Sequence, residues 1–203
     1  MKTLLLFGGG GHCRACIDVI EAQAVYKISG IVTPSGDSAE QDVFGYPIVG
    51  CDDDIPALMA KHSRAFIAVG QIRSPEVRIR LFDMVKSSGA ELPIVQSPWA
   101  YCSRRAVVGE GSILMHKCVV NANARIGANC IINSHALVEH DVEIADNCHI
   151  ATGARVNGDV RISKDCFVGS GAILREGINI GSGALIGAGQ VVLHDVPPGA
   201  VRR

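Results

Sequence analysis

A histidine followed directly by an aspartate, His140 and Asp141, is the residue pair in this chain best suited to proton transfer. The pair lies in the densest polar stretch of the second half of the chain, residues 133–141. An imidazole titrates near neutral pH and is the usual general base, and a carboxylate on its other nitrogen fixes the tautomer and raises its basicity. The pair predicts general-base catalysis, while spacing alone leaves a solvated surface histidine as the alternative.

Four consecutive glycines, residues 8–11, precede His12 and follow a short apolar run. Backbone amides of glycines at the start of a helix favour a phosphate group. The run does not fit the dinucleotide pattern G-x-G-x-x-G, because Cys13 stands where the last glycine belongs. No clear acidic residue ends the expected second strand, where a dinucleotide enzyme holds a ribose. The sequence therefore argues against NAD binding.

Three other groups of reactive side chains have structural explanations. Cys13 and Cys16 have a C-x-x-C spacing but lie on an expected helix, which favours two partly buried packing cysteines over redox chemistry. The acidic run Asp52–Asp54 is explained by capping and charging the start of a helix. The scattered histidines show no paired ligand spacing, so the sequence predicts no metal site.

The elements that must position these residues follow two different patterns, with a change near residue 100. Residues 1–95 alternate strand-like and helix-like segments, which predicts a parallel α/β sheet about half the size of a full dinucleotide-binding domain. The expected segments are strands at 2–7, 28–32, 65–69 and 91–95, and helices at 12–24, 52–62 and 75–88.

From Val108 to Val192, every sixth residue is aliphatic, fifteen times in succession. A small or β-branched residue stands four positions after nearly every one of them. This hexad period predicts a left-handed parallel β-helix of five 18-residue coils with the aliphatic residues inside. Buried cysteines at 118, 130, 148 and 166 are expected as small apolar fillers. Glycines directly after an aliphatic residue, such as Gly127 and Gly169, are expected to supply the positive φ of the turns.

Composition excludes several classes of function. The 203 residues carry 19 Lys and Arg against 20 Asp and Glu, a balance that argues against a nucleic-acid partner. No apolar run approaches the roughly 20 residues of a membrane helix. The short apolar start stops too early for a signal peptide, so we expect a cytoplasmic protein with reduced cysteines. The length allows two domains, a Rossmann-like domain at 1–100 and the β-helix at 101–203.

Four segments together resemble one enzyme family: FGGGGH at the start, FIAVG in the first half, and INSHALVEHDVEI and NCHIATGARVNGDVRI in the β-helix. The chain resembles, over essentially its whole length, the hexapeptide-repeat N-acetyltransferases of the bacillosamine and perosamine type and the related sialic acid O-acetyltransferases. The resemblance implies transfer of an acetyl group from acetyl-CoA to the amine of a nucleotide-linked 4-amino deoxysugar. It also implies a homotrimer with active sites between subunits and no metal.

The resemblance assigns a role to each matching residue. It implies that His140 is the catalytic base, that Asp141 enhances it, and that Asn133 lies near the acceptor. It also implies that acetyl-CoA is contacted by His149, Ser170 and Ala188. The nucleotide-sugar is expected at Gly10, Gly11, His12 and Gly70. Spacing adds that Thr152, Ser170 and Ala188 follow one another at 18-residue intervals, so they should stack in successive coils. Because no cysteine stands beside a base, direct transfer is expected rather than an acyl-enzyme.

One segment departs from the family pattern and keeps alternatives open. Members of the bacillosamine type carry acidic residues after the second strand, whereas here residues 32–37 contain only Asp37. The nucleotide and the sugar are therefore not assigned, and O-acetylation of a sialic-acid-like sugar is the first alternative. The second is a β-helix without transferase activity, either purely structural or resembling γ-carbonic anhydrase with zinc on His116, His135 and His140.

Overall fold

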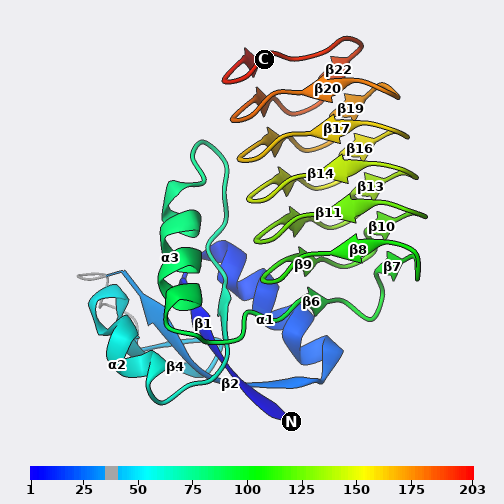
Figure 1. Ribbon diagram of the computed structural model, residues 1–203. Helices are drawn as coiled ribbons and strands as arrows, with labels where there is room; N and C mark the ends of the chain where they lie inside the picture. The colour runs from blue at the N-terminus through cyan, green and yellow to red at the C-terminus, as the bar shows by residue number, and fades with distance from the viewer. Residues whose placement is uncertain (35–40) are drawn as a thin grey trace. The chain divides into compact units, whose positions relative to one another are not determined.

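The computed structural model describes residues 1–34 and 41–203, so Asp37 lies outside the described residues. The chain forms two compact units, one of Met1–Gly70 with Glu76–Val95 and one of Gln71–Pro75 with Gln96–Arg203 (Figure 1). No helix within the described ranges is long and apolar enough to cross a membrane.

The first unit is built on a five-stranded sheet with the order β3-β4-β2-β1-β5. Its strands are β1 (Lys2–Phe7), β2 (Tyr26–Thr33), β3 (Asp42–Val43), β4 (Tyr46–Cys51) and β5 (Ala65–Ile67). All neighbouring strands are parallel except the hairpin of β3 and β4. The apolar side chains at the end of β1 are fully buried, as expected for a parallel strand covered on both faces.

Helices follow the strands, as the alternating pattern predicts. They are α1 (Gly11–Gln23), the 3₁₀ turn η1 (Asp52–Asp54), α2 (Ile55–Met59) and α3 (Glu76–Ser87). Cys13 and Cys16 are buried on α1, and burial raises the pKa of the Cys13 thiol to about 12. Their predicted packing role is confirmed, because thiols held in the neutral form are unreactive.

Two expectations for the first unit are wrong, and one element of it was not expected. No strand runs over 91–95: Glu91 makes an isolated bridge with Arg64, and Pro93 supplies no N–H for a ladder. The hairpin of β3 and β4 was not expected, although Phe44 and Gly45 both adopt the positive φ of a tight hairpin turn. The helix expected at 52–62 is split into η1 and α2 and ends at Met59.

The second unit is the predicted left-handed β-helix, with two-residue strands stacked in three sheets (Figure 1). Residues 18 positions apart pair in parallel, for example Ile126 with Ile144. The coils begin earlier than the aliphatic repeat, at β6 and β7. The strands are β6 (Val95–Gln96), β7 (Tyr101–Cys102), β8 (Val107–Val108), β9 (Ile113–Leu114), β10 (Val119–Val120), β11 (Arg125–Ile126), β12 (Ile131–Ile132), β13 (Leu137–Val138), β14 (Glu143–Ile144), β15 (His149–Ile150), β16 (Arg155–Val156), β17 (Arg161–Ile162), β18 (Phe167–Val168), β19 (Ile173–Leu174), β20 (Asn179–Ile180), β21 (Leu185–Ile186), β22 (Val191–Val192) and β23 (Val201–Arg202).

The interior of the β-helix is a continuous column of aliphatic and small side chains. Cys118, Cys130, Cys148 and Cys166 are fully buried within it, which confirms their predicted filling role. Aromatic rings are too large for this narrow column, in agreement with the aromatic content of 4%.

The expected role of the glycines that follow the aliphatic residues is wrong. Positive φ occurs three positions after the aliphatic residue instead, at Asn123, Asp141 and other turn residues. Gly127 is needed for close approach, because a Cβ there would lie 2.3 Å from the Asp146 side chain and 2.6 Å from its backbone nitrogen. A Cβ at Gly181 would lie 2.3 Å from the Pro198 nitrogen. These glycines let each turn pack against the turn of the next coil.

Candidate active site

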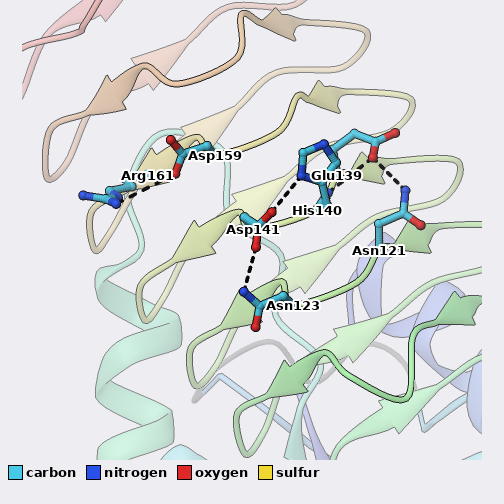
Figure 2. Close-up of polar contacts among 7 residues, drawn as sticks. All are labelled: Asn121, Asn123, Glu139, His140, Asp141, Asp159 and Arg161. Carbon is cyan, nitrogen blue, oxygen red and sulfur yellow. Dashed lines mark hydrogen bonds and ion pairs between the residues drawn. The ribbon is translucent and has the colours of Figure 1, made fainter.

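The adjacent residues His140 and Asp141 form a hydrogen-bonded pair on one corner of the β-helix, in the turn between β13 and β14. Asp141 adopts the left-handed conformation, with φ of 61°. This turn directs both side chains outward, where the Nδ1–H of His140 donates to Oδ2 of Asp141 over 2.8 Å (Figure 2). The bond fixes the tautomer and leaves Nε2 of His140 as the proton acceptor.

Asn123 extends this pair from the preceding coil. Its Nδ2 donates to Oδ1 of Asp141 over 2.7 Å, so both carboxylate oxygens of Asp141 are engaged (Figure 2). The bond from Asn123 is the main cause of the lowered pKa of Asp141, followed by the bond from His140. Asp141 thus remains an anion able to hold the imidazole. Sequence reasoning missed Asn123, although it stands 18 residues before Asp141, which is one full coil.

A second carboxylate lies on the other side of His140. Oε2 of Glu139 accepts hydrogen bonds from Nδ2 of Asn121 over 2.8 Å and from the backbone N–H of His140 over 3.3 Å (Figure 2). The pKa of His140 is raised, first by its bond to Asp141 and further by the charges of Asp141, Glu139 and Asp159. The imidazole is therefore a stronger base than an ordinary surface histidine.

Gly158, one coil after His140, leaves the space that the imidazole ring occupies. A Cβ at this position would lie 2.7 Å from Cε1 and 2.9 Å from Nε2 of His140. Any larger residue would press against the edge of the ring that carries the proton-accepting nitrogen. This contact could have been found in the sequence, because Gly158 stands 18 residues, or one coil, after His140.

His149 and Asn133 form a second polar group, which is largely buried. Nδ1 of His149 lies 2.6 Å from the carbonyl oxygen of Gln71 and must donate to it, since a carbonyl only accepts. Nε2 of His149 then accepts from Nδ2 of Asn133 at 3.1 Å, and the ring meets Phe167 edge-on. His149 and Asn133 are therefore hydrogen-bonded to each other, although the family resemblance assigns the first to acetyl-CoA and the second to the acceptor. Sequence reasoning missed their partner, Gln71.

The stacking predicted for Thr152, Ser170 and Ala188 is present in the turns of successive coils. The N–H of Gly171 donates to the carbonyl of Thr152, and the N–H of Gly189 donates to that of Ser170. All three predicted side chains are exposed. The same line of turns runs back to Ser134, beside Asn133, through the bond from Gly153 to the carbonyl of Ser134. This corner therefore carries the predicted cofactor residues, whereas His140 occupies the next corner along the chain.

The three histidines of the zinc alternative lie on two corners of the β-helix, and the N–H of His135 donates to the carbonyl of His116 in the preceding coil. Nδ1 of His116 lies 2.7 Å from Oγ of Ser97, and the His116 ring is 5.0 Å from that of Trp99. His135 occupies a positive-φ turn position, and His140 lies on another corner. Over residues 1–34 and 41–203, no three His, Cys, Asp or Glu side chains are grouped so that they could hold a metal ion.

In the first unit, the predicted nucleotide-sugar residues surround one cavity of 360 Å³. Its lining includes Gly10 from the loop after β1, Gly11 and His12 at the start of α1, and Gly70 from the loop after β5. A Cβ on Gly70 would lie 3.2 Å from Cβ of His12, so this glycine lets the loop after β5 approach the start of α1. At Gly10 and Gly11 a Cβ would meet nothing within 4 Å, so the start of α1 faces open space.

The position of this cavity follows from the strand order. β1 has β2 on one side and β5 on the other, so the connections that leave β1 and β5 diverge at their carboxyl ends. Ligands of open parallel sheets bind at such a point. Arg78 of α3, 1% exposed, fixes the loop after β5 by donating to the carbonyls of Ile67 and Val69.

Comparison with protein-family models gives three matches. Residues 3–85 match the PglD N-terminal domain, residues 105–140 match the bacterial transferase hexapeptide of six repeats, and residues 159–194 match the hexapeptide repeat of succinyl-transferase. Comparison with curated protein sequences gives no match.

Solved structures similar to this chain cover nearly its whole length. The acetyltransferase domain of PglB from Neisseria gonorrhoeae, in complex with acetyl coenzyme A, is 30% identical with a TM-score of 0.89, covering 98% of this chain and 95% of that one. PerB from Caulobacter crescentus, in complex with CoA and GDP-perosamine, is 30% identical with a TM-score of 0.90, covering 99% and 93%. WeeI from Acinetobacter baumannii is 26% identical with a TM-score of 0.85, covering 99% and 96%.

The two halves of the chain thus match the two halves of one kind of enzyme, in the same order and without large gaps. The glycine-rich cavity lies in the part that matches the PglD N-terminal domain, and the His140–Asp141 pair lies in the part that matches the hexapeptide transferases. This protein belongs to the hexapeptide-repeat sugar acetyltransferases of the bacillosamine and perosamine type.

Proposed function

We propose that this acyltransferase moves the acetyl group of acetyl-CoA onto the amine of a nucleotide-linked 4-amino deoxysugar, in the cytoplasm. The observation that carries this assignment is the full-length likeness to PglB, crystallised with acetyl-CoA, and to PerB, crystallised with CoA and GDP-perosamine. Each unit supplies one feature that such a reaction requires: the second unit a candidate proton acceptor, His140, and the first unit a cavity proposed to take a phosphate-bearing substrate.

His140 is the proposed general base. As the sugar nitrogen attacks the thioester carbonyl, a C–N bond forms, the C–S bond breaks, and the amine proton passes to Nε2 of His140. His140 then gives this proton to the sulfur of the leaving CoA thiolate. Asp141 keeps the ring in the productive tautomer and stabilises the imidazolium that forms, and Asn123 holds Asp141.

We place acetyl-CoA along the corner formed by Thr152, Ser170 and Ala188. The exposed small side chains of this line leave room for an extended pantetheine arm. His149 and Asn133, hydrogen-bonded to one another, lie at the same corner and supply polar groups near the acetyl end. Asn133 then faces the acceptor amine, as the resemblance implies.

The proposed base and the proposed cofactor line lie on different corners of the same β-helix. A single chain therefore presents two half-sites, which a neighbouring copy can complete by placing its own corner against this one. We propose a homotrimer with three such composite sites. Light scattering should give three times the 21.4 kDa chain mass, and a monomeric mass for the active enzyme would contradict this assembly.

The nucleotide-sugar is proposed to occupy the cavity of the first unit. Its diphosphate would meet the backbone amides at the start of α1, where Gly10 is the N-cap residue and no side chain caps the helix. Oriented N–H groups and the positive end of the helix dipole favour negative charge at this point. His12 and Gly70 line the same cavity.

Release of CoA thiol from acetyl-CoA is the direct test, measured against UDP-, GDP- and dTDP-linked 4-amino sugars with free sialic acid as the control acceptor. Turnover on an amino sugar nucleotide is the expected result and identifies the nucleotide at the same time. Turnover on sialic acid alone would replace the proposal with O-acetylation. No turnover on any acceptor would remove the assigned acceptor class.

A further inference from the structure

Among the described residues that line the cavity of the first unit, Asp52 is the only carboxylate. It directly follows β4, whose last residue, Cys51, is the register partner of Thr33 at the end of β2. Asp52 therefore stands at the carboxyl edge of the sheet, one strand away from the end of β2. The chain continues there with Pro34, which also lines the cavity but offers no polar side chain.

The carboxylate of Asp52 is held in a fixed orientation. Nη2 of Arg80 donates to its Oδ2 over 2.8 Å, and the Asp52 side chain is only 15% exposed. Within the part of the chain that the structure describes, no donor is bonded to Oδ1 of Asp52. One oxygen is therefore anchored by a cation, and the other remains as a hydrogen-bond acceptor on a residue that lines the cavity.

The charge of Asp52 determines which part of a nucleotide it can meet. A carboxylate repels the diphosphate but accepts hydrogen bonds from hydroxyl groups. β4 lies two strands from β1, about 10 Å at the usual strand spacing. With the diphosphate at the start of α1, which follows β1, the ribose of the same nucleotide extends toward Asp52.

In dinucleotide-binding folds, an acidic residue near the end of the second strand accepts a hydrogen bond from the ribose 2′-hydroxyl. Here β2 ends at Thr33 and is followed by Pro34, and the acid stands directly after the neighbouring strand instead. We propose that Asp52, oriented by Arg80, binds the ribose 2′-hydroxyl and selects ribonucleotide-linked over 2′-deoxyribonucleotide-linked sugars. This inference rests on the proposed function and narrows its substrates to UDP- or GDP-linked sugars, excluding dTDP-linked ones.

Calorimetric titration of the full-length protein with UDP against 2′-deoxy-UDP, and with GDP against 2′-deoxy-GDP, tests the proposal directly. A hydrogen bond from a hydroxyl to a charged group predicts at least about tenfold tighter binding of the better ribonucleotide than of its deoxy form. The Asp52→Ala variant should bind the two forms with equal affinity. In the Arg80→Met variant the carboxylate remains but loses its anchor, so the preference should shrink without vanishing.

Asp53→Ala is the matched control, because it removes a neighbouring, exposed carboxylate that does not line the cavity. It should retain the full preference, and Asp37→Ala should do so too. Equal binding of ribose and deoxyribose forms by the unaltered protein, a preference that survives Asp52→Ala, or a preference lost in Asp37→Ala would overturn the inference. An unchanged circular dichroism melting curve shows that each variant is folded. Absence of binding by every nucleotide would instead refute the nucleotide site itself, and the inference with it.

Discussion

The two units of this protein obtain their active groups by opposite means. In the β-helix, each residue meets the residues 18 positions before and after it, so Asn123, Asp141 and Asp159 form one line that can be counted along the sequence. In the first unit, the cavity gathers loops from β1, β4 and β5 that no fixed interval relates. Periodic contacts can be read from a sequence, whereas contacts between non-periodic elements depend on the whole topology.

The two units are also expected to respond differently to amino-acid substitutions. A substitution in the β-helix acts on its stacked neighbours and leaves distant coils intact, because each coil contacts only the adjacent ones. A substitution at the edge of the first sheet can move several loops together, because one side chain such as Arg78 holds two carbonyls of the loop beside the cavity. Four substitutions test this comparison.

The largest effect is expected for His140→Ala in the β-helix. Loss of the general base should lower kcat by about 10²- to 10⁴-fold with little change in the KM for acetyl-CoA, because His140 lies away from the proposed cofactor line. Steady-state kinetics with the identified acceptor measure both constants, and turnover close to that of the unaltered enzyme would disprove the assignment. An unchanged circular dichroism melting curve should show that the coil tolerates the exposed substitution.

In the first unit, Arg78→Met should reduce stability more than any exposed substitution. It removes the donor from the buried carbonyl of Ile67 and the half-buried carbonyl of Val69, at a cost of about 1–3 kcal/mol for the buried acceptor left unsatisfied. The melting transition should fall and nucleotide binding should weaken, since Val69 borders the cavity. Arg80→Met provides the exposed control on the same helix. An equal loss of stability in the two variants would refute the buried role of Arg78.

Gly158→Ala tests the steric contact beside the proposed base. The added Cβ meets the movable ring of His140, so kcat should fall about tenfold while the melting temperature changes little. Gly127→Ala is the matched control, because its Cβ meets the backbone of the next coil and should lower stability first. A melting temperature lowered equally by both, with kcat unaffected in Gly158→Ala, would show that Gly158 serves only coil packing.

The smallest effect, a severalfold loss of kcat, is expected for Asn123→Ala. Without the Asn123 bond, the pKa of Asp141 rises and its carboxylate is less well oriented, so the raised pKa of His140 falls toward its ordinary value. Activity needs the neutral imidazole, so it rises as pH passes through the pKa of His140. The acidic limb of the kcat/KM profile should therefore move to lower pH. A reduced rate with an unmoved limb would assign Asn123 a purely structural role.

Much of the β-helix site was predictable because its main pair is adjacent in sequence and its supports lie one coil away. Asn123 and Gly158 could have been found by stepping 18 residues from Asp141 and His140. Gln71 could not, because 78 residues separate it from His149 and no repeat connects them. The strand expected at 91–95 could have been rejected from the sequence, because Pro93 stands in its middle and cannot donate to a ladder.

By itself, the sequence determined the β-helix, its register and the pairing of His140 with Asp141, because a repeat of six fixes which side chains face inward and which residues stack. Only the tertiary structure decided which loops surround the cavity of the first unit and that Asp52 lines it. These features depend on strand order and on the directions of individual turns, and neither is encoded at a constant interval along the chain.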